Sequence, residues 1–135
     1  MLTGKCLCEG VRYEVTGELG ALGYCHCKQC QRASGSAFAA NSAIARKDIR
    51  FVAGEDLIRE YESSPGRFRA FCSRCGSPVY KHVLEQPESI RIRLGLLDGD
   101  PGPRARVHVF VASKAPWYEI ADALPQFDLG LPPRK

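Results

Sequence analysis

Seven cysteines stand in three tight groups and nowhere else in the 135 residues. Thiolate sulfur binds zinc and iron–sulfur clusters in preference to hard cations. Two short cysteine pairs from distant parts of a chain can converge on one ion and make a tetrahedral zinc site. The glycines Gly10 and Gly76 follow two of the groups and permit the tight turns that such sites need. The grouping therefore indicates metal chemistry at Cys6-Leu7-Cys8, Cys25-His26-Cys27-Lys28-Gln29-Cys30 and Cys72-Ser73-Arg74-Cys75.

Neither inert thiols nor a disulfide framework fits this distribution of cysteines as well. Inert thiols behave as small apolar side chains and scatter among core positions, whereas these are grouped. A disulfide framework favours an even number of cysteines and an oxidising compartment, and a bridge within a Cys-x-Cys pair is strained. The first residues lack the features of a signal peptide, and no apolar run approaches the roughly 18–20 residues of a membrane helix. We therefore expect a cytoplasmic protein with reduced thiols and no membrane partner.

The count of seven suggests how the cysteines divide. A structural zinc site is closed by four protein ligands, whereas a catalytic one keeps three and leaves a position for water or substrate. The middle group can supply three ligands locally, and the two outer pairs would then form a closed site. The residues alone do not force this division, because the middle group could instead share ligands with one of the pairs.

The three histidines are not expected to be ligands. His26 alternates with Cys25 and Cys27, so on an extended segment its side chain points away from theirs. We expect it to pack or to make a hydrogen bond that supports the cysteines. His82 and His108 are isolated on strand-like runs and are expected to be structural.

Apolar residues mostly recur with a period of two, which is typical of β-strands. Helical signal is confined to 28–33 and to 116–123. In the second segment, Pro116 stands near the first turn and Pro125 shortly beyond the end. The length fits one domain, which we place at 1–125, followed by a proline-rich extended tail at 126–135. We predict a mainly β protein of two packed sheets, or of sheets arranged around metal sites. The expected strands are 11–15, 36–45, 49–52, 56–61, 67–71, 90–96 and 106–111.

The net charge of +4 comes from dispersed basic residues. Arginines alternate with apolar residues, as in Arg91-Ile92-Arg93-Leu94, which is the pattern of a solvated strand face. This dispersion argues against nucleic acid as a partner and favours a small anion or thiol. Lys28 and Arg32 flank the middle cysteine group, where they would either attract the carboxylates of such a ligand or remain solvated surface charges.

Three motifs follow one another along the chain, Gly4-x-Cys6-x-Cys8-x-Gly10-x2-Tyr13, Cys25-His26-Cys27-x2-Cys30-x-Arg32 and Phe71-Cys72-x2-Cys75-Gly76-Ser77. A fourth stretch, Ser113-Lys114-Ala115-Pro116-Trp117, is followed by Ile120, Asp122, Leu124 and Pro125. Together these residues resemble the glutathione-dependent formaldehyde-activating enzyme family, which includes the domain of centromere protein V. The resemblance covers nearly the whole chain. It departs at Glu9, where glycine is expected beside Gly10, and this puts the local loop in doubt but none of the ligands.

The resemblance implies a β-tent fold, a mostly antiparallel β architecture with two zinc sites. The family joins formaldehyde and glutathione to give S-hydroxymethylglutathione and catalyses the reverse reaction. We accordingly expect a carbon–sulfur lyase with glutathione as a possible co-substrate. Carried onto this sequence, Cys6, Cys8, Cys72 and Cys75 would hold a structural zinc, Cys25, Cys27 and Cys30 an exchangeable catalytic zinc, and Lys28 and Arg32 would bind the co-substrate.

An open site with three thiolates could act in several ways. It could take the substrate sulfur as its fourth ligand or polarise a carbonyl group, or glutathione could displace the ion. No general base stands beside the motif, and Glu9 or His108 would have to reach it through folding. The alternative to an enzyme is a non-catalytic zinc-binding module that recognises a thiol ligand or a protein. The oligomeric state does not follow from the sequence.

Overall fold

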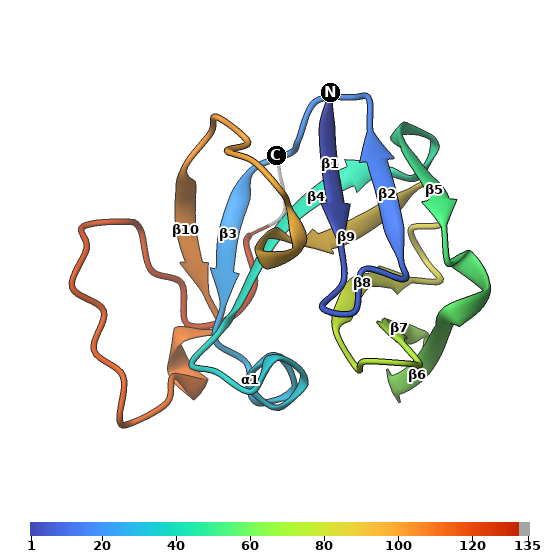
Figure 1. Ribbon diagram of the computed structural model, residues 1–135. Coiled ribbons are helices and arrows are strands. Elements are labelled where there is room, and N and C mark those ends of the chain that lie inside the picture. Colours follow the sequence, from blue (N-terminus) through green and yellow to red (C-terminus); the bar gives the residue numbers. More distant parts are fainter. Residues whose placement is uncertain (133–135) are drawn as a thin grey trace. The chain divides into compact units, whose positions relative to one another are not determined.

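The computed structural model describes residues 1–132 and is built mainly of β-strands (Figure 1). Two compact units divide the chain. The first contains residues 1–20 and 42–102, and the second contains residues 21–41 and the chain from 103 onward. Strand β4 (Ala39–Ala45) runs through the point at which the chain passes from the second unit into the first. None of the described helices is long and apolar enough to cross a membrane.

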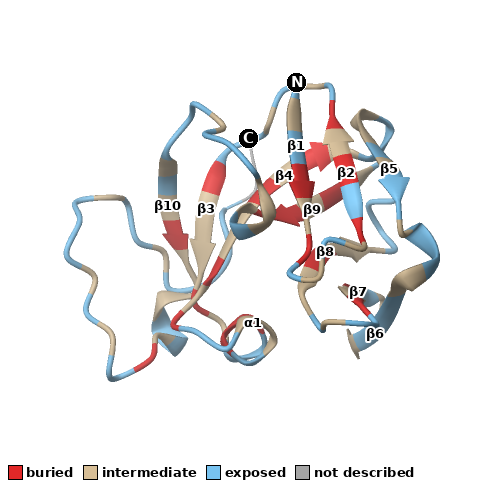
Figure 2. Cartoon of the chain, in the orientation of Figure 1, coloured by how far each residue is buried: buried red, intermediate tan, exposed pale blue. Residues whose placement is uncertain are grey.

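The first unit is built of antiparallel strand pairs. A three-stranded sheet has the order β1-β2-β5. In a further sheet, β4 is followed by β9, β8, β7 and β6 in that spatial order. Only the end of β4 belongs to this unit. Most residues of β6 are exposed (Figure 2), and its charged side chains suit a sheet edge. The bounds are β1 Leu2–Lys5, β2 Arg12–Val15, β5 Ile49–Ala53, β6 Ile58–Ser64, β7 Arg67–Cys72, β8 Pro78–Val83 and β9 Ser89–Arg93.

The core of the first unit follows the alternation of its strands. Tyr13 and Val15 of β2 are buried, as are Ile90 and Ile92 of β9. Because successive side chains of a strand point to opposite faces, these pairs share the inner face of their sheets. They pack in one apolar cluster with Val11, Ile44, Ala70 and Val79, and with the cysteines Cys6 and Cys72.

The second unit places a parallel strand pair next to a short helix. Strand β10 (Ala105–Val109) pairs in parallel with β3 (Leu22–Cys25), and β3 neighbours β4. Helix α1 (Lys28–Ser34) begins after Cys27, whose side chain accepts a hydrogen bond from the backbone N–H of Cys30. It ends at Gly35, whose left-handed backbone is typical of a helix C-cap.

The predicted mainly β fold of antiparallel sheets with little helix is confirmed, and each segment expected to be a strand contains one. Some of these strands are shorter than predicted, because single 3-10 turns occupy 55–57 and 94–96. The sequence pattern missed β1, β3 and β8. Gly4 and Gly23 interrupt the first two, and Pro78 opens the third, so each carries a residue that lowers strand propensity.

The helix predicted at 116–123 is wrong. Lys114 donates hydrogen bonds from Nζ to the carbonyls of Ala115 and Tyr118, and the Tyr118 ring packs edge-on against Phe38. Asp122 accepts a hydrogen bond from His108 on β10. The local bonds of Lys114 and the tertiary contacts of Tyr118 and Asp122 hold the segment as an irregular loop, since they outweigh the weak helix propensity of so short a stretch.

The chain after Pro125 runs along the end of β10. The backbone N–H of His108 donates to Pro125 O at 2.9 Å, and that of Phe127 donates to His108 O at 2.9 Å. The N–H of Phe110 donates to Leu129 O at 3.0 Å. Of the segment predicted as an extended tail, 126–135, the residues 133–135 lie outside the described part of the chain.

Candidate metal centres

Four cysteines of the first unit come together from two distant loops. Cys6 and Cys8 lie after β1, Cys72 ends β7, and Cys75 lies in the turn before β8, with all four sulfurs within 4.8 Å of one another. The Sγ atoms of Cys6 and Cys8 are 3.6 Å apart, and those of Cys8 and Cys72 are 3.8 Å apart. A tetrahedral ion with Zn–S bonds of about 2.3 Å requires edges of about 3.8 Å. The donor atoms therefore fit a tetrahedral metal ion of the size of zinc.

The backbone around these cysteines directs amide groups at the sulfurs. The N–H of Val11 lies 3.3 Å from Cys6 Sγ, and the N–H of Gly10 lies 3.4 Å from Cys8 Sγ. Glu9 has a φ of 64°, in the left-handed region that favours glycine. This conformation explains why glycine was expected there, and the loop nevertheless closes with Glu9 N donating to Cys6 O at 2.9 Å.

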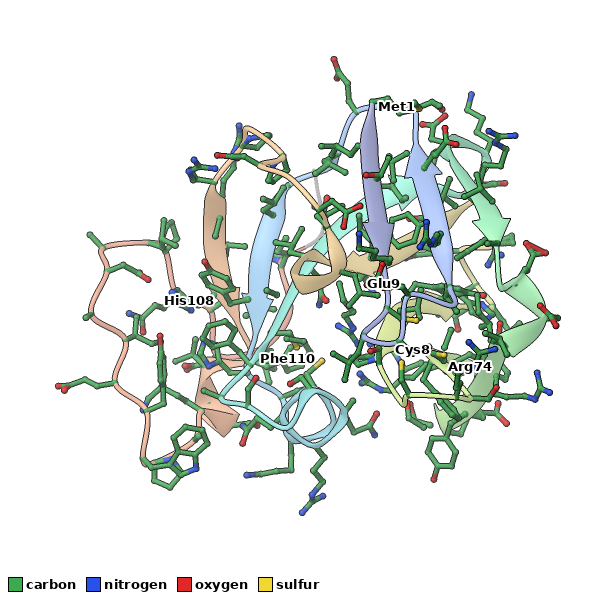
Figure 3. All side chains as sticks on the ribbon, in the orientation of Figure 1. Met1, Cys8, Glu9, Arg74, His108 and Phe110 are labelled. Atoms are coloured by element: carbon green, nitrogen blue, oxygen red, sulfur yellow. The ribbon has the colours of Figure 1, made fainter. Side chains whose placement is uncertain are left out.

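Ser77 connects the two cysteine loops of this cluster, and Arg74 of one loop lies close to Gly10 of the other. The Ser77 hydroxyl lies 3.3 Å from Cys75 Sγ and accepts a hydrogen bond from the N–H of Leu7 at 2.9 Å. Arg74 lies beside Cys8 (Figure 3). Its guanidinium is so close to the backbone of Gly10 that a Cβ atom added to this glycine would lie 3.0 Å from Arg74 Nη1. A positive charge at this position offsets part of the negative charge that four thiolates carry around a divalent ion.

The pKa values of Cys8 and Cys75 are shifted in opposite directions. Desolvation acts to raise the pKa of Cys75, but hydrogen bonds from Ser77 and other neighbours outweigh it and lower this pKa to about 5. The Gly10 N–H acts to lower the pKa of Cys8, but desolvation and the adjacent thiols raise it to about 11. A bound cation would allow all four to be thiolates together.

Three cysteines of the second unit form a separate cluster. Cys25 ends β3, Cys27 caps α1, and Cys30 lies in the first turn of that helix, with their sulfurs within 4.8 Å of one another. Within residues 1–132 no imidazole or carboxylate joins this group of possible ligands. The thiols of Cys27 and Cys30, together with burial, raise the pKa of Cys25. Three crowded thiols of this kind suit a cation, and they leave a tetrahedral ion one ligand short.

Lys28 and Arg32 are exposed side chains of α1, four residues apart. Residues at this spacing share one face of a helix. Lys28 Nζ donates to Gln31 Oε1 at 3.0 Å. The two basic groups are thus available to solvent on the helix that carries Cys30.

A hydrogen-bonded chain of three side chains begins at His26, between Cys25 and Cys27. His26 Nε2 is 2.7 Å from His108 Nδ1, and His108 Nε2 is 2.9 Å from Asp122 Oδ2. Burial lowers the pKa of His26, and the hydrogen bond from His108 lowers the pKa of Asp122. The His26 nitrogens do not belong to the group of ligand atoms that the three thiols form. The chain itself was missed, although His26 and Asp122 both belong to the motifs and His108 stands on a recognised strand.

Neither candidate general base is free beside the three-cysteine cluster. His108 is fully buried between His26 and Asp122. Glu9 belongs to the loop of the four-cysteine cluster and pairs with Arg12, their charged atoms lying 3.4 Å apart.

Comparison with known proteins identifies relatives of this chain. The model of the glutathione-dependent formaldehyde-activating enzymes matches residues 1–113. A protein of Halomonas elongata, provisionally named a glutathione-dependent formaldehyde-activating enzyme, is 30% identical over 128 residues, which cover 89% of this chain and 81% of that protein. The crystal structure of a Rhodobacter sphaeroides protein has a TM-score of 0.59 and 27% identity, over 73% of this chain and 89% of that one. The chain therefore belongs to the glutathione-dependent formaldehyde-activating enzyme family.

Proposed function

We propose that the protein is a zinc-dependent carbon–sulfur lyase that acts on glutathione or on adducts of thiols with aldehydes. The observation that carries this proposal is the unequal make-up of the two clusters. Four thiols converge in the first unit, whereas three converge in the second without a further ligand among the described residues. Closed four-ligand sites are typical of structural zinc, and three-ligand sites are typical of catalytic zinc.

Cys6, Cys8, Cys72 and Cys75 would hold the structural ion. Their role would be to join the loop after β1 to the β7–β8 turn. Cys8 of the first and Cys72 of the second are 64 residues apart in the sequence. Metal binding at such a site contributes directly to the free energy of folding. Removal of this ion would therefore destabilise the first unit.

Cys25, Cys27 and Cys30 would hold the catalytic ion. When bound there, zinc supplies Lewis acidity and an open position at which a substrate thiol is kept as thiolate. In the forward reaction the substrate sulfur forms a bond to the aldehyde carbon. The π electrons of the carbonyl move to its oxygen, and this oxygen takes up the proton that the thiol gives up. In the reverse reaction the carbon–sulfur bond breaks and the same proton returns to sulfur.

The exposed charges of Lys28 and Arg32 would orient the substrate. Glutathione carries two carboxylates, and charge-assisted hydrogen bonds from ammonium and guanidinium groups bind such groups well. Both residues lie on α1, one turn apart, on the helix that bears Cys30. Their position supports a role in binding rather than in the bond-making step.

The test is the zinc content per chain with and without glutathione, for wild type and for Cys27→Ser. We expect two zinc ions in wild type and one in the variant, with glutathione perturbing only the ion that the variant lacks. Cys27→Ser should then abolish formation of S-hydroxymethylglutathione, followed by NMR. A single zinc that neither the substitution nor glutathione affects would overturn the enzyme proposal and favour a non-catalytic zinc-binding module.

A matched control separates loss of the ion from loss of the fold. Cys75→Ser changes a thiol of the four-cysteine cluster in the same way. It should lower the thermal stability of the protein more than Cys27→Ser does, because the closed site ties together distant segments of the chain.

A further inference from the structure

Two buried imidazoles and a carboxylate are linked in series in the second unit. The rings of His26 and His108 have no exposed surface, whereas the side chain of Asp122 is 41% exposed. Burying an imidazole costs free energy unless its nitrogens find hydrogen-bond partners. Parallel pairing of β10 with β3 brings these partners together from positions 82 residues apart.

The exposed carboxylate of Asp122 determines which nitrogens donate and which accept along this series of side chains. An ionised Asp122 only accepts, so His108 Nε2–H donates to it. A neutral His108 then accepts at Nδ1, and the donor is His26 Nε2–H. Each ring is thereby held in one tautomer and one orientation. His26 Nδ1 has no hydrogen-bond partner within the described residues, so the ring is held by hydrogen bonding from the His108 side alone.

The backbone of His26 is held as firmly as its ring. Its N–H donates to Val109 O at 2.9 Å, and its carbonyl accepts from Gln31 Nε2 at 2.7 Å. Gln31 is buried and also donates to Ser113 O at 2.9 Å. Residue 26 is therefore fixed at three points: its ring and its N–H are bonded to β10, and its carbonyl is bonded to α1.

Fixing His26 determines where the neighbouring thiols point. Cys25 and Cys27 flank it on an extended segment, so their side chains project from the opposite side of the backbone. We propose that His26, held by His108 and Asp122, is a positioning residue that orients Cys25 and Cys27 so that they bind a metal ion together with Cys30. This inference rests on the metal-binding role proposed above for the three-cysteine cluster. Residues that support ligands in this way typically affect metal affinity roughly 10- to 100-fold.

Cobalt(II) titration followed by thiolate-to-metal absorption tests the proposal in the whole protein. His26→Leu introduces an apolar side chain of similar size and removes the hydrogen bond to His108. We expect the affinity for one of the two cobalt ions to fall about 10- to 100-fold, with the other ion unaffected. His26→Gln places an amide N–H near the position of Nε2 and should restore most of the affinity, which a purely space-filling role would not require.

His82→Leu is the matched control. Its Nε2 lies 2.8 Å from Glu60 Oε2 in the first unit, and both cobalt affinities should match those of wild type. Wild-type affinity and absorption in folded His26→Leu would overturn the positioning role while leaving the proposed function intact. Wild-type protein that binds only one ion would overturn both.

A variant of Asp122, the exposed member of the hydrogen-bonded series, keeps the proposal testable if His26→Leu misfolds. If circular dichroism shows that His26→Leu does not fold, the cobalt titration of Asp122→Ala tests the proposal instead. Asp122 is a surface residue, and its removal frees His108 to turn. Loss of affinity at the same single cobalt site supports the positioning role, and unchanged affinity overturns it.

Discussion

The loop that carries Cys6 and Cys8 depends on one close approach between two glycines. Gly54 has a φ of 74°, and a Cβ placed on it would lie 2.0 Å from the carbonyl oxygen of Gly10. Because Gly10 donates its N–H toward Cys8 Sγ, this contact supports the backbone of the four-cysteine cluster. Gly66 has the same left-handed backbone, with a φ of 75°, but nothing lies within 4 Å of a Cβ placed there.

The two glycines separate the effect of backbone conformation from that of steric clash. Gly66→Ala should lower the free energy of unfolding by about 1 kcal/mol, the cost of a left-handed conformation for alanine. Gly54→Ala should lower it by about 3 kcal/mol, since the backbone of the cysteine loop must also move. Urea unfolding of the zinc-bound protein measures both values, and equal losses would show that the loop yields freely to a methyl group.

At the level of single residues the sequence predicted donor types better than backbone shape. Short spacing in the sequence alone brings together the thiols of Cys25, Cys27 and Cys30, so their grouping could be predicted. The left-handed conformation of Glu9 was anticipated only as a missing glycine. No sequence pattern reveals that a glutamate is held there, because the cost is offset by hydrogen bonds that exist only in the folded loop.

Strand β10 organises the elements of the second unit. On one side it pairs with β3, so that Val109 lies opposite Cys25, and on the other its end bonds to the chain after Pro125. Its residue His108 joins the loop of Asp122 to the cysteine segment. A single strand thus connects β3, the cysteine segment, the loop of Asp122 and the chain after Pro125.

The carboxylate of Asp122 makes this connection sensitive to acid. Its hydrogen bond from His108 lowers its pKa in the folded protein, so it contributes stability above its ordinary pKa of about 4, and that contribution is lost as pH falls through the folded value. Asp122→Asn should therefore unfold at lower urea concentration than wild type near neutral pH, with the difference shrinking below about pH 4. A difference that stays constant with pH would show that the charge of Asp122 is not what matters.

Elements with clear alternation were predictable, and the element that carries Asp122 was not. Strands such as β2 and β7 follow from local pattern alone. The segment 116–123 has helix-like punctuation, but Tyr118 and Asp122 find partners on other elements that no local pattern records. For the same reason the link between His26 and His108 could not be inferred, since it depends on which strand lies beside β3.

The whole molecule has one cysteine cluster in each compact unit. The four-cysteine cluster packs with the apolar core of the first unit, where Cys6 and Cys72 are buried. The second unit contains, besides its cluster, a parallel strand pair, α1 and a ring group formed by His26, Phe38 and Tyr118. The sequence predicted a single domain and the two clusters, but it gave no sign that each cluster belongs to its own unit, because both units are assembled from separated stretches of chain.

If each cluster holds an ion as proposed, this division predicts that the two metal ions stabilise different parts of the chain. Metal binding is coupled to the folding of the segments that supply the ligands, and local opening proceeds through contiguous structural units. The ion held by three thiolates should be removed first by a chelator. Hydrogen exchange read by mass spectrometry should then show loss of amide protection in 22–35 and 105–129, while β7, β8 and β9 stay protected. Protection should fall in those strands only when the second ion leaves. Simultaneous loss throughout the chain on removal of the first ion would mean that the two units unfold as one, and that the three-cysteine cluster supports the fold of both.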